Sequence, residues 1–331
     1  MVSRPIVSVI VPCYNERKTI EFLLDALRKQ TFSTANMEVI IADGRSTDGT
    51  RQAIAEYQKH WAELSVTVVD NPERIIPAAL NHALAAARGE YILRLDAHAV
   101  PRPDYVERCL TVLQAGKAEN VGGVWEILPG GKGWLARSIA AAAAHPLGAG
   151  DALYRHSRQA QYVDTVPFGA FRRDLIEKIG LFNTALHSNE DYEFNVRLKG
   201  TGGRIWLDPQ IRSQYFARAT LGALVRQYLR YGYWKGRMLK TNMGSLRWRQ
   251  ALPPLFVFAQ FLLAAGAFFT EWSRFLLAGL LSGYVLILLA AGVQAALRRR
   301  DPPLLIGFPL AIAAMHYTWG TALLYGLLRP G

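Results

Sequence analysis

Cysteine is scarce in this chain of 331 residues, where Cys13 and Cys109 are the only two. They form no C-x-x-C pair and no disulfide framework, so the sequence predicts a reducing compartment and no structural zinc. The N-terminus passes straight into a short apolar strand and shows no signal-peptide pattern. We therefore expect the N-terminal part of the protein to stay in the cytosol.

Charged residues almost vanish beyond Arg249. Three apolar segments follow, at 253–270, 275–297 and 304–328, and each is near the roughly 20 residues needed to cross a bilayer. The alternative is a set of buried helices in a soluble bundle, but such helices usually carry a polar stripe and 275–297 has almost none. The sequence thus predicts a membrane domain at 251–331 with three transmembrane helices.

Basic clusters flank these segments, with RWRQ at 247–250 and RRR at 298–300. Because basic flanks stay on the cytosolic side, we expect a multi-pass inner-membrane protein with residues 1–250 in the cytosol and the C-terminus outside. Arg274, in the intervening loop, departs from this asymmetry. Residues 221–240 mix Leu, Tyr and Trp with Arg and Lys, which predicts an interfacial helix within a 221–250 region; an ordinary surface helix is the alternative.

The formal net charge is +12. An excess of this size suits a nucleic acid, an anionic lipid or a phosphorylated substrate as partner. The chain has no basic low-complexity run, and its tail is too apolar for a soluble nucleic-acid binder. The sequence therefore favours membrane lipid or a phosphorylated substrate and predicts no nucleic-acid partner.

Strands and helices alternate over residues 6–127. Short β-branched runs predict strands at 6–11, 38–42, 66–70, 91–95 and 121–127, with helical patterns at 16–29, 48–59, 77–88 and 103–115. This order is typical of an α/β fold with a mostly parallel sheet and right-handed crossovers. The binding crevice of such a sheet lies at the carboxyl ends of its strands.

Polar residues gather at these strand ends: Asn15, Glu16, Asp43, Asn71, Asp96 and His98. The first βα turn, PCYNE, lacks the G-x-G-x-x-G pattern, which argues against a dinucleotide-binding domain. A carboxylate at the position of Asp43 can accept a hydrogen bond from a nucleobase, although it can also simply form the turn. Asp96 and His98 would suit Mg²⁺ or Mn²⁺ if a diphosphate supplied the other ligands, although turn chemistry alone could also explain them.

A second acidic cluster lies at Glu190, Asp191 and Glu193, before a helical pattern. Acidic residues are favoured at helix N-termini, but three exceed what a cap needs. Carboxylates that lie close together raise one another's pKa, which suits one of them to general-base catalysis.

Six stretches together identify a resemblance. They are VSVIVPCYNE, IADGRSTDGT, ARGEYILRLDAH, FGAFRRD, NEDYEFNVRL and RQYLRYGYW, and they occur in the order seen in inverting glycosyltransferases of family 2. They cover residues 6–240, and the apolar tail is most similar to the ExoA-type branch, which builds bacterial exopolysaccharide. The resemblance implies a GT-A fold, within a catalytic domain at 1–220, that binds a nucleotide sugar.

The resemblance also implies roles for individual residues. Asp96 and His98 take the place of the D-x-D motif and would bind the metal, Mn²⁺ or Mg²⁺, with His98 in place of the usual second Asp. Asp191 would be the base that deprotonates the acceptor hydroxyl. The nucleotide-sugar site would comprise Pro12, Tyr14, Glu16, Asp43 and Asp96, and the acceptor site would comprise Glu190, Gln227, Arg230, Tyr231 and Trp234.

We therefore expect a UDP-sugar-dependent hexosyltransferase that moves a sugar, glucose in the first instance, to a polyprenyl-diphosphate-linked saccharide at the cytosolic membrane face. A polyprenyl-phosphate sugar synthase, a small processive synthase and a non-enzymatic membrane adaptor are the alternatives. Tyr231 stands where polymerising relatives have Trp, and the membrane domain is small, which argues against a polymer-extruding synthase.

Overall fold

The computed structural model describes residues 4–150, 152–241 and 243–329. The chain forms two compact units. The first comprises residues 1–126 and 156–215, and the second comprises residues 127–155 and 216–331. The predicted domain bounds at 220 and 250 stay a prediction; the structure adds that the insertion at 127–155 belongs with the C-terminal helices.

The first unit contains the predicted parallel strands. β1 (Val7–Cys13) pairs in parallel with β2 (Met37–Asp43) and with β4 (Tyr91–Arg94), and β2 pairs in parallel with β3 (Ser65–Asp70). Every residue of β1, β2 and β4 is buried, as expected for strands covered on both faces. The expected α/β fold is therefore confirmed, and the ends of β1, β2 and β4 lie at one edge of the sheet.

Antiparallel strands complete this sheet, which makes it mixed. β8 (Ala170–Arg172) pairs with β4 on one side and with β6 (Asn120–Pro129) on the other. The predicted strand at 121–127 therefore exists within β6, but β8 separates it from β4. The shorter β5 (Val100–Pro101) and β7 (Gln161–Tyr162) both pair with the long β9 (Ile205–Ala217).

The predicted helices of this unit are all present. The first is amphipathic, with Ile20, Leu23, Leu24 and Leu27 buried at helical spacing. Their bounds are α1 (Ile20–Arg28), α2 (Thr50–His60), α3 (Ile76–Ala86) and α4 (Tyr105–Gln114), and α7 (Asp174–Ile179) and α8 (Glu190–Gly200) follow.

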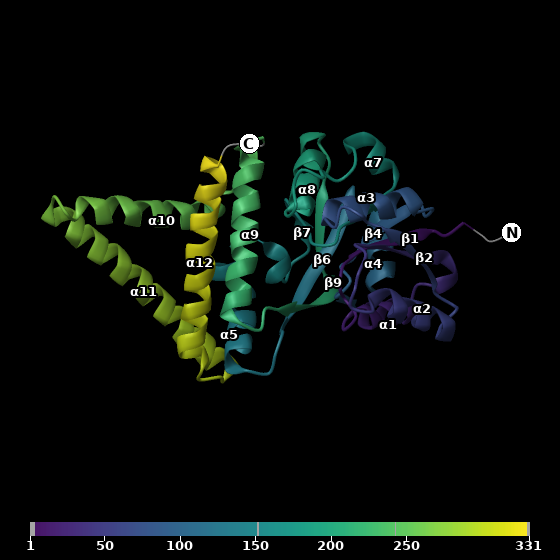
Figure 1. Ribbon diagram of the computed structural model, residues 1–331, viewed down its shortest axis with the longest axis horizontal. Helices are drawn as coiled ribbons and strands as arrows, with labels where there is room; N and C mark the ends of the chain where they lie inside the picture. The colour runs from purple at the N-terminus through teal and green to yellow at the C-terminus, as the bar shows by residue number, and fades with distance from the viewer. Residues whose placement is uncertain (1–3, 151, 242, 330–331) are drawn as a thin grey trace. The chain divides into compact units, whose positions relative to one another are not determined.

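The second unit is helical and is shown in Figure 1. The insertion forms α5 (Trp134–Ala143) and α6 (Pro146–Ala149), and the C-terminal part forms α9 (Leu221–Leu239), α10 (Trp248–Gly266), α11 (Glu271–Arg299) and α12 (Leu304–Leu328). The predicted interfacial helix coincides with α9, and the three apolar segments coincide with α10, α11 and α12. Among the described residues, only α11 is long and apolar enough to be a candidate membrane span. The three-span, multi-pass topology therefore lacks support from α10 and α12.

Candidate functional site

The loops after β1 and β2 are joined by hydrogen bonds at the carboxyl edge of the sheet. The backbone N–H of Asn15 donates to the hydroxyl of Ser46 at 2.7 Å, and that of Thr47 donates to Oδ1 of Asn15 at 2.9 Å. Asp48 accepts from the backbone N–H of Arg17 and from that of Thr50, the first residue of α2. These bonds fix the two loops as one rigid border of the crevice.

Asp43 lies at the end of β2 and its side chain is fully buried. It accepts from the backbone N–H and hydroxyl of Ser46 and from Nε of Arg51, the last at 2.5 Å. Arg51 also pairs with Asp70 and so lowers the pKa of that carboxyl. Asp43 thus organises the loop, and its predicted contact with a nucleobase stays a prediction.

Tyr14 offers an aromatic face beside this loop. Its side chain is 46% exposed, and the guanidinium of Arg74 lies 5.7 Å from the centre of its ring. Gly44 lies against the ring, because a Cβ there would be only 3.0 Å from Cδ2 of Tyr14. Pro12 is buried within β1, opposite Ala42. Nucleotide binding by Pro12 and Tyr14 remains a prediction.

Glu16 and His98 meet across the edge of the sheet. Nδ1 of His98 lies 3.0 Å from Oε1 of Glu16, although the two residues follow different strands. Glu16 is itself fixed, because its carboxylate accepts from the hydroxyl of Thr19 and its backbone N–H donates to the hydroxyl of Thr50 at 2.9 Å. A carboxylate bonded to one imidazole nitrogen sets the orientation of the ring, as is common for metal-binding histidines.

Arg94, the last residue of β4, gathers three carboxylates. Its Nη2 lies 3.1 Å from Asp96 and 2.9 Å from Glu190, and its Nη1 pairs with Asp191. The side chain of Arg94 is only 4% exposed. Burial opposes its charge, but the carboxylates of Asp96 and Glu190 outweigh burial and keep the pKa of Arg94 above its ordinary value. The predicted metal ligand and the predicted base are therefore linked through one buried cation.

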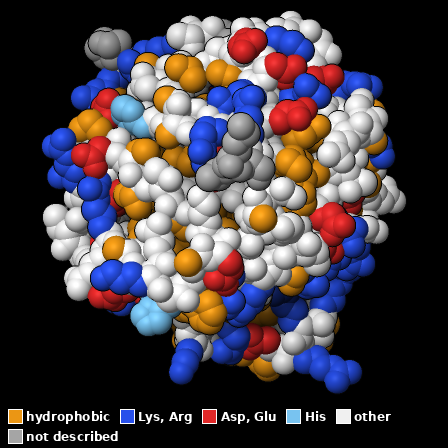
Figure 2. All heavy atoms as spheres, turned by 90° about the vertical axis from the view of Figure 1, so that its right-hand side faces the viewer, with side chains coloured by type: hydrophobic (Ala, Val, Ile, Leu, Met, Phe, Trp, Pro, Cys, Tyr) orange, Lys and Arg blue, Asp and Glu red, His pale blue; other side chains and the backbone are white. Residues whose placement is uncertain are grey.

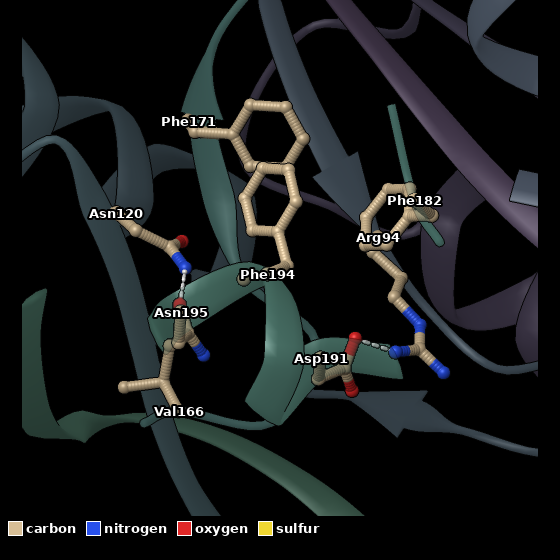
Figure 3. Close-up of a pocket in the computed structure, with 9 residues that line it drawn as sticks. Arg94, Asn120, Val166, Phe171, Phe182, Asp191, Phe194 and Asn195 are labelled. Atoms are coloured by element: carbon tan, nitrogen blue, oxygen red, sulfur yellow. Dashed lines mark hydrogen bonds and ion pairs between the residues drawn. The ribbon is translucent and has the colours of Figure 1, made fainter. Parts of the chain in front are cut away.

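A small pocket opens beside this cation, and Figure 3 shows Asp191 and Arg94 facing each other at one end of it. At the other end, Nδ2 of Asn120 donates to Oδ1 of Asn195 at 2.7 Å, and Asn195 donates in turn to Thr165 at 2.9 Å. This chain of amides anchors α8 to β6 and so fixes the helix that carries Asp191.

The sequence analysis did not identify Arg94. The residue lies in YILRL, where a single basic residue in a strand gives no local signal, and Glu190 and Asp191 lie on a helix far along the chain. Of the second acidic cluster, Glu193 does not join this group; its carboxylate pairs with Arg197 at 2.8 Å. Glu190 contacts Arg94, and its predicted role in acceptor binding stays a prediction.

The chemistry of the donor set fits a divalent cation. Asp96 supplies a carboxylate and His98 an imidazole, a combination that Mn²⁺ accepts. Three carboxylates around one guanidinium also leave excess negative charge. Among the described residues, no cluster of three or more acidic, His or Cys side chains could hold an ion by itself. The predicted arrangement, in which Asp96 and His98 bind the ion together with a diphosphate, stays a prediction.

The remaining predicted acceptor residues lie on α9, in the second unit. Nε2 of Gln227 donates to the hydroxyl of Tyr231 at 3.0 Å, and Arg230 lies against the ring of Tyr231. Trp234 is one turn further along and contacts Tyr233. Gln227, Tyr231 and Trp234 thus share a helix face, and their acceptor contacts stay a prediction.

Comparison with known proteins identifies the family. The family model "Glycosyl transferase family 2" matches residues 8–180, and the succinoglycan biosynthesis protein ExoA of Rhizobium meliloti is 30% identical over 94% of this chain and 92% of its own. The chain belongs to glycosyltransferase family 2. The ExoA-like resemblance is confirmed.

Other similar proteins agree with this family. A Methanococcus voltae protein, named "Dolichyl N-acetyl-alpha-D-glucosaminyl phosphate 3-beta-D-2,3-diacetamido-2,3-dideoxy-beta-D-glucuronosyltransferase", is 26% identical over 98% of this chain and 97% of its own. The structure of the mannosyltransferase PcManGT from Pyrobaculum calidifontis, solved with GDP-Man and Mn²⁺, is similar with a TM-score of 0.62 at 23% identity, over 95% of this chain and 87% of its own. This likeness confirms the expected GT-A fold.

Proposed function

We propose that this glycosyltransferase moves a sugar, glucose in the first instance, from a UDP-sugar to a lipid-linked saccharide at the cytosolic face of the membrane. The observation that supports the proposal is the convergence of Asp96 and Asp191 on Arg94, because the first is the predicted donor-side ligand and the second is the predicted base. The similar M. voltae protein supports the acceptor class, since its name describes transfer to a sugar on dolichyl phosphate.

The acceptor hydroxyl would attack C1 of the donor sugar from the side opposite the nucleotide. Its proton would pass to Asp191 while the bond from C1 to the diphosphate breaks, and this inverts the anomeric carbon. Arg94, which pairs with Asp191, would hold this carboxylate oriented for the step. Asp96 and His98 would hold a divalent cation, which would supply Lewis-acid stabilisation of the departing diphosphate.

Two features of the surface support a location at the membrane. α11 carries an apolar surface that is largely exposed, and basic residues flank the apolar helices. Figure 2 shows basic side chains interspersed with acidic ones on one face of the molecule, rather than collected into a stripe. The absence of a nucleic-acid partner stays a prediction.

The direct test is to incubate the purified full chain with Mn²⁺, a membrane lipid extract and a panel of UDP- and GDP-sugars. GDP-mannose belongs in the panel because PcManGT was solved with GDP-Man, and UDP-GlcNAc belongs there because Staphylococcus aureus TarS, similar in fold with a TM-score of 0.52, was solved with it. Mass spectrometry should show a lipid-linked saccharide heavier by one hexose with UDP-glucose. Product only with a GDP-sugar would overturn the donor proposal. A product on free polyprenyl phosphate would favour the synthase alternative.

A further inference from the structure

The helices α10 and α11 leave most of their side chains exposed. In α10 only Pro254 and Val257 are buried, and in α11 only Leu288, Gly292 and Ala296. Many of the exposed side chains on these helices and on the turn between them are large and apolar. They include Phe261, Phe268, Phe269, Trp272, Phe275 and Leu297, all at least 69% exposed. A continuous apolar surface of this kind requires a cover.

The turn between these helices is ordered and explains Arg274. Nε of Arg274 donates to the backbone carbonyl of Ala267 at 2.8 Å, just beyond the end of α10. Thr270 caps α11, because its hydroxyl accepts from the backbone N–H of Ser273 at 3.2 Å. Arg274, which departs from the basic-flank pattern in the sequence, is therefore a helix cap at the tip of a hairpin. Figure 1 shows α10 and α11 converging on this tip.

In contrast, α12 is a core helix of its unit. It lies along α9 at close range, where a Cβ on Gly236 would be 2.4 Å from the carbonyl oxygen of Leu323 and one on Gly326 would be 2.4 Å from that of Tyr233. Seven apolar side chains of α12 are buried: Leu304, Phe308, Ala311, Ile312, Met315, Ala322 and Leu323.

Polar contacts hold α12 to the other elements of its unit as well. Asp301, just before α12, accepts two bonds from Arg137 of α5 at 2.8 and 3.1 Å. Nε2 of His316 lies 2.7 Å from the carbonyl oxygen of Leu147 in α6. At the far end of α12, the carbonyl of Arg329 accepts from Arg237 of α9 at 3.1 Å. The helix is thus fixed to its neighbours at both ends and in the middle.

The partner helix α9 cannot cross a bilayer at low cost. It carries the cations Arg226, Arg230, Lys235 and Arg237 within 19 residues, and charged side chains in a bilayer core are strongly disfavoured. Because α12 is packed along α9, it stays on the side of the membrane where α9 lies.

We propose that the α10–α11 hairpin is the membrane-crossing element, and that α9 and α12 stay on the catalytic side, by which we mean the side where residues 1–220 lie. Two crossings return the chain, so Arg329 lies on the catalytic side. This topology differs from the three crossings that the sequence predicts, and it does not depend on the proposed activity.

α11 is long and apolar enough to cross a membrane, and α10, which is less apolar, is close to a bilayer core in length. The 19 residues of α10 span about 28 Å at 1.5 Å per residue, close to the ~30 Å of a hydrocarbon core. Residues 250–270 and 275–297 contain no charged side chain. The two ends of the hairpin on the catalytic side are basic, with Arg247 and Arg249 near the start of α10 and three arginines at 298–300. Glu271 and Arg274 at the tip then reach the far headgroups, where their charge is tolerated.

The test is labelling of single added cysteines by a membrane-impermeant maleimide, using the full chain expressed in a bacterium. The two native cysteines are buried and should not react. Phe269→Cys marks the tip, Arg329→Cys marks the end of α12, and Lys59→Cys on α2 marks the catalytic side. We expect Phe269→Cys to be labelled in cells whose outer membrane has been permeabilised and whose inner membrane is intact. Arg329→Cys and Lys59→Cys should be labelled only after lysis.

Labelling of Arg329→Cys in intact cells would overturn the proposal, because it would show a third crossing by α12. Protection of Phe269→Cys until lysis would also overturn it, since the tip would then not reach the far side. Alkaline carbonate extraction distinguishes a hairpin covered by lipid from one covered by a second copy of the chain. Release of the wild-type chain as a soluble dimer would show the second copy and would overturn the proposal.

Discussion

Replacing Arg94 tests whether one buried cation holds the donor and acceptor sides of the site together. Arg94→Met keeps much of the side-chain volume and removes the charge. Removing one partner of a buried ion pair costs about 3–5 kcal/mol in the free energy of unfolding. Glu190 is only 7% exposed and would lose its cation, whereas Asp96 and Asp191 are each 27% exposed and can regain water. We therefore expect the low end, about 3 kcal/mol.

The rate of sugar transfer should fall as well. Without the guanidinium, Asp191 is free to rotate, and misplacement of a reacting group by about 1 Å can cost about 10²-fold in rate. Arg94→Lys keeps the charge, but a single ammonium cannot hold three carboxylates in the fork geometry of arginine. We expect a smaller loss of stability in Arg94→Lys than in Arg94→Met, with a similar loss of kcat.

The assay combines thermal unfolding in detergent with steady-state sugar transfer. Arg102→Met is the matched control, because the Arg102 side chain is 51% exposed and its ion pair with Glu126 lies at the surface, where such pairs contribute about 0–1 kcal/mol. Wild-type kcat and unfolding temperature in Arg94→Met would refute the role of Arg94. A loss of stability with unchanged kcat would make Arg94 structural only.

Three further outcomes are expected. Asp96→Ala should abolish metal-dependent nucleotide binding in calorimetry, and full activity in EDTA would contradict the metal role. Burial alone would raise the pKa of Glu38, but hydrogen bonds from Ser8 and Arg88 outweigh it and lower this pKa below 4.5. The ionised Glu38 therefore stabilises the fold above pH 4.5, and this stabilisation is lost as the pH falls through the lowered pKa. Glu38→Gln should therefore destabilise the protein by about 1.5–3 kcal/mol at neutral pH, and the unfolding curves should converge in acid; a constant difference would contradict this. Gly236→Leu should lower the free energy of unfolding by at least about 1–3 kcal/mol, because the new side chain would force α9 away from α12. Gly222→Leu, at an exposed position on the same helix, should leave stability nearly unchanged. Equal melting temperatures of the two variants would contradict this.

Strand ends were predictable because their signal is local. Asp43, Asp96 and His98 each follow an apolar run in the sequence, and parallel pairing of β1 with β2 and β4 places these ends at one edge. The bond between His98 and Glu16 forms at this edge, but no local pattern in the sequence predicts it.

The partners of Arg94 could not be predicted, because they depend on the packing of α8 against the sheet. The order of β4, β8 and β6 was equally inaccessible, since β8 is only three residues long and lies between strands distant in sequence. Apolar composition did predict helices at α10, α11 and α12. Composition could not separate lipid-facing helices from buried ones. Glycines pack α12 on α9, but glycine is also common in membrane-spanning helices.

The most direct test of the proposed mechanism compares donor binding with sugar transfer in Asp191→Asn. Calorimetry with Mn²⁺ and UDP-glucose should give a Kd close to that of the wild type, because the proposed role of Asp191 is to deprotonate the acceptor. Transfer to the lipid-linked saccharide should be abolished. Wild-type transfer in this variant would contradict a base at Asp191, and loss of donor binding would show that the residue is structural.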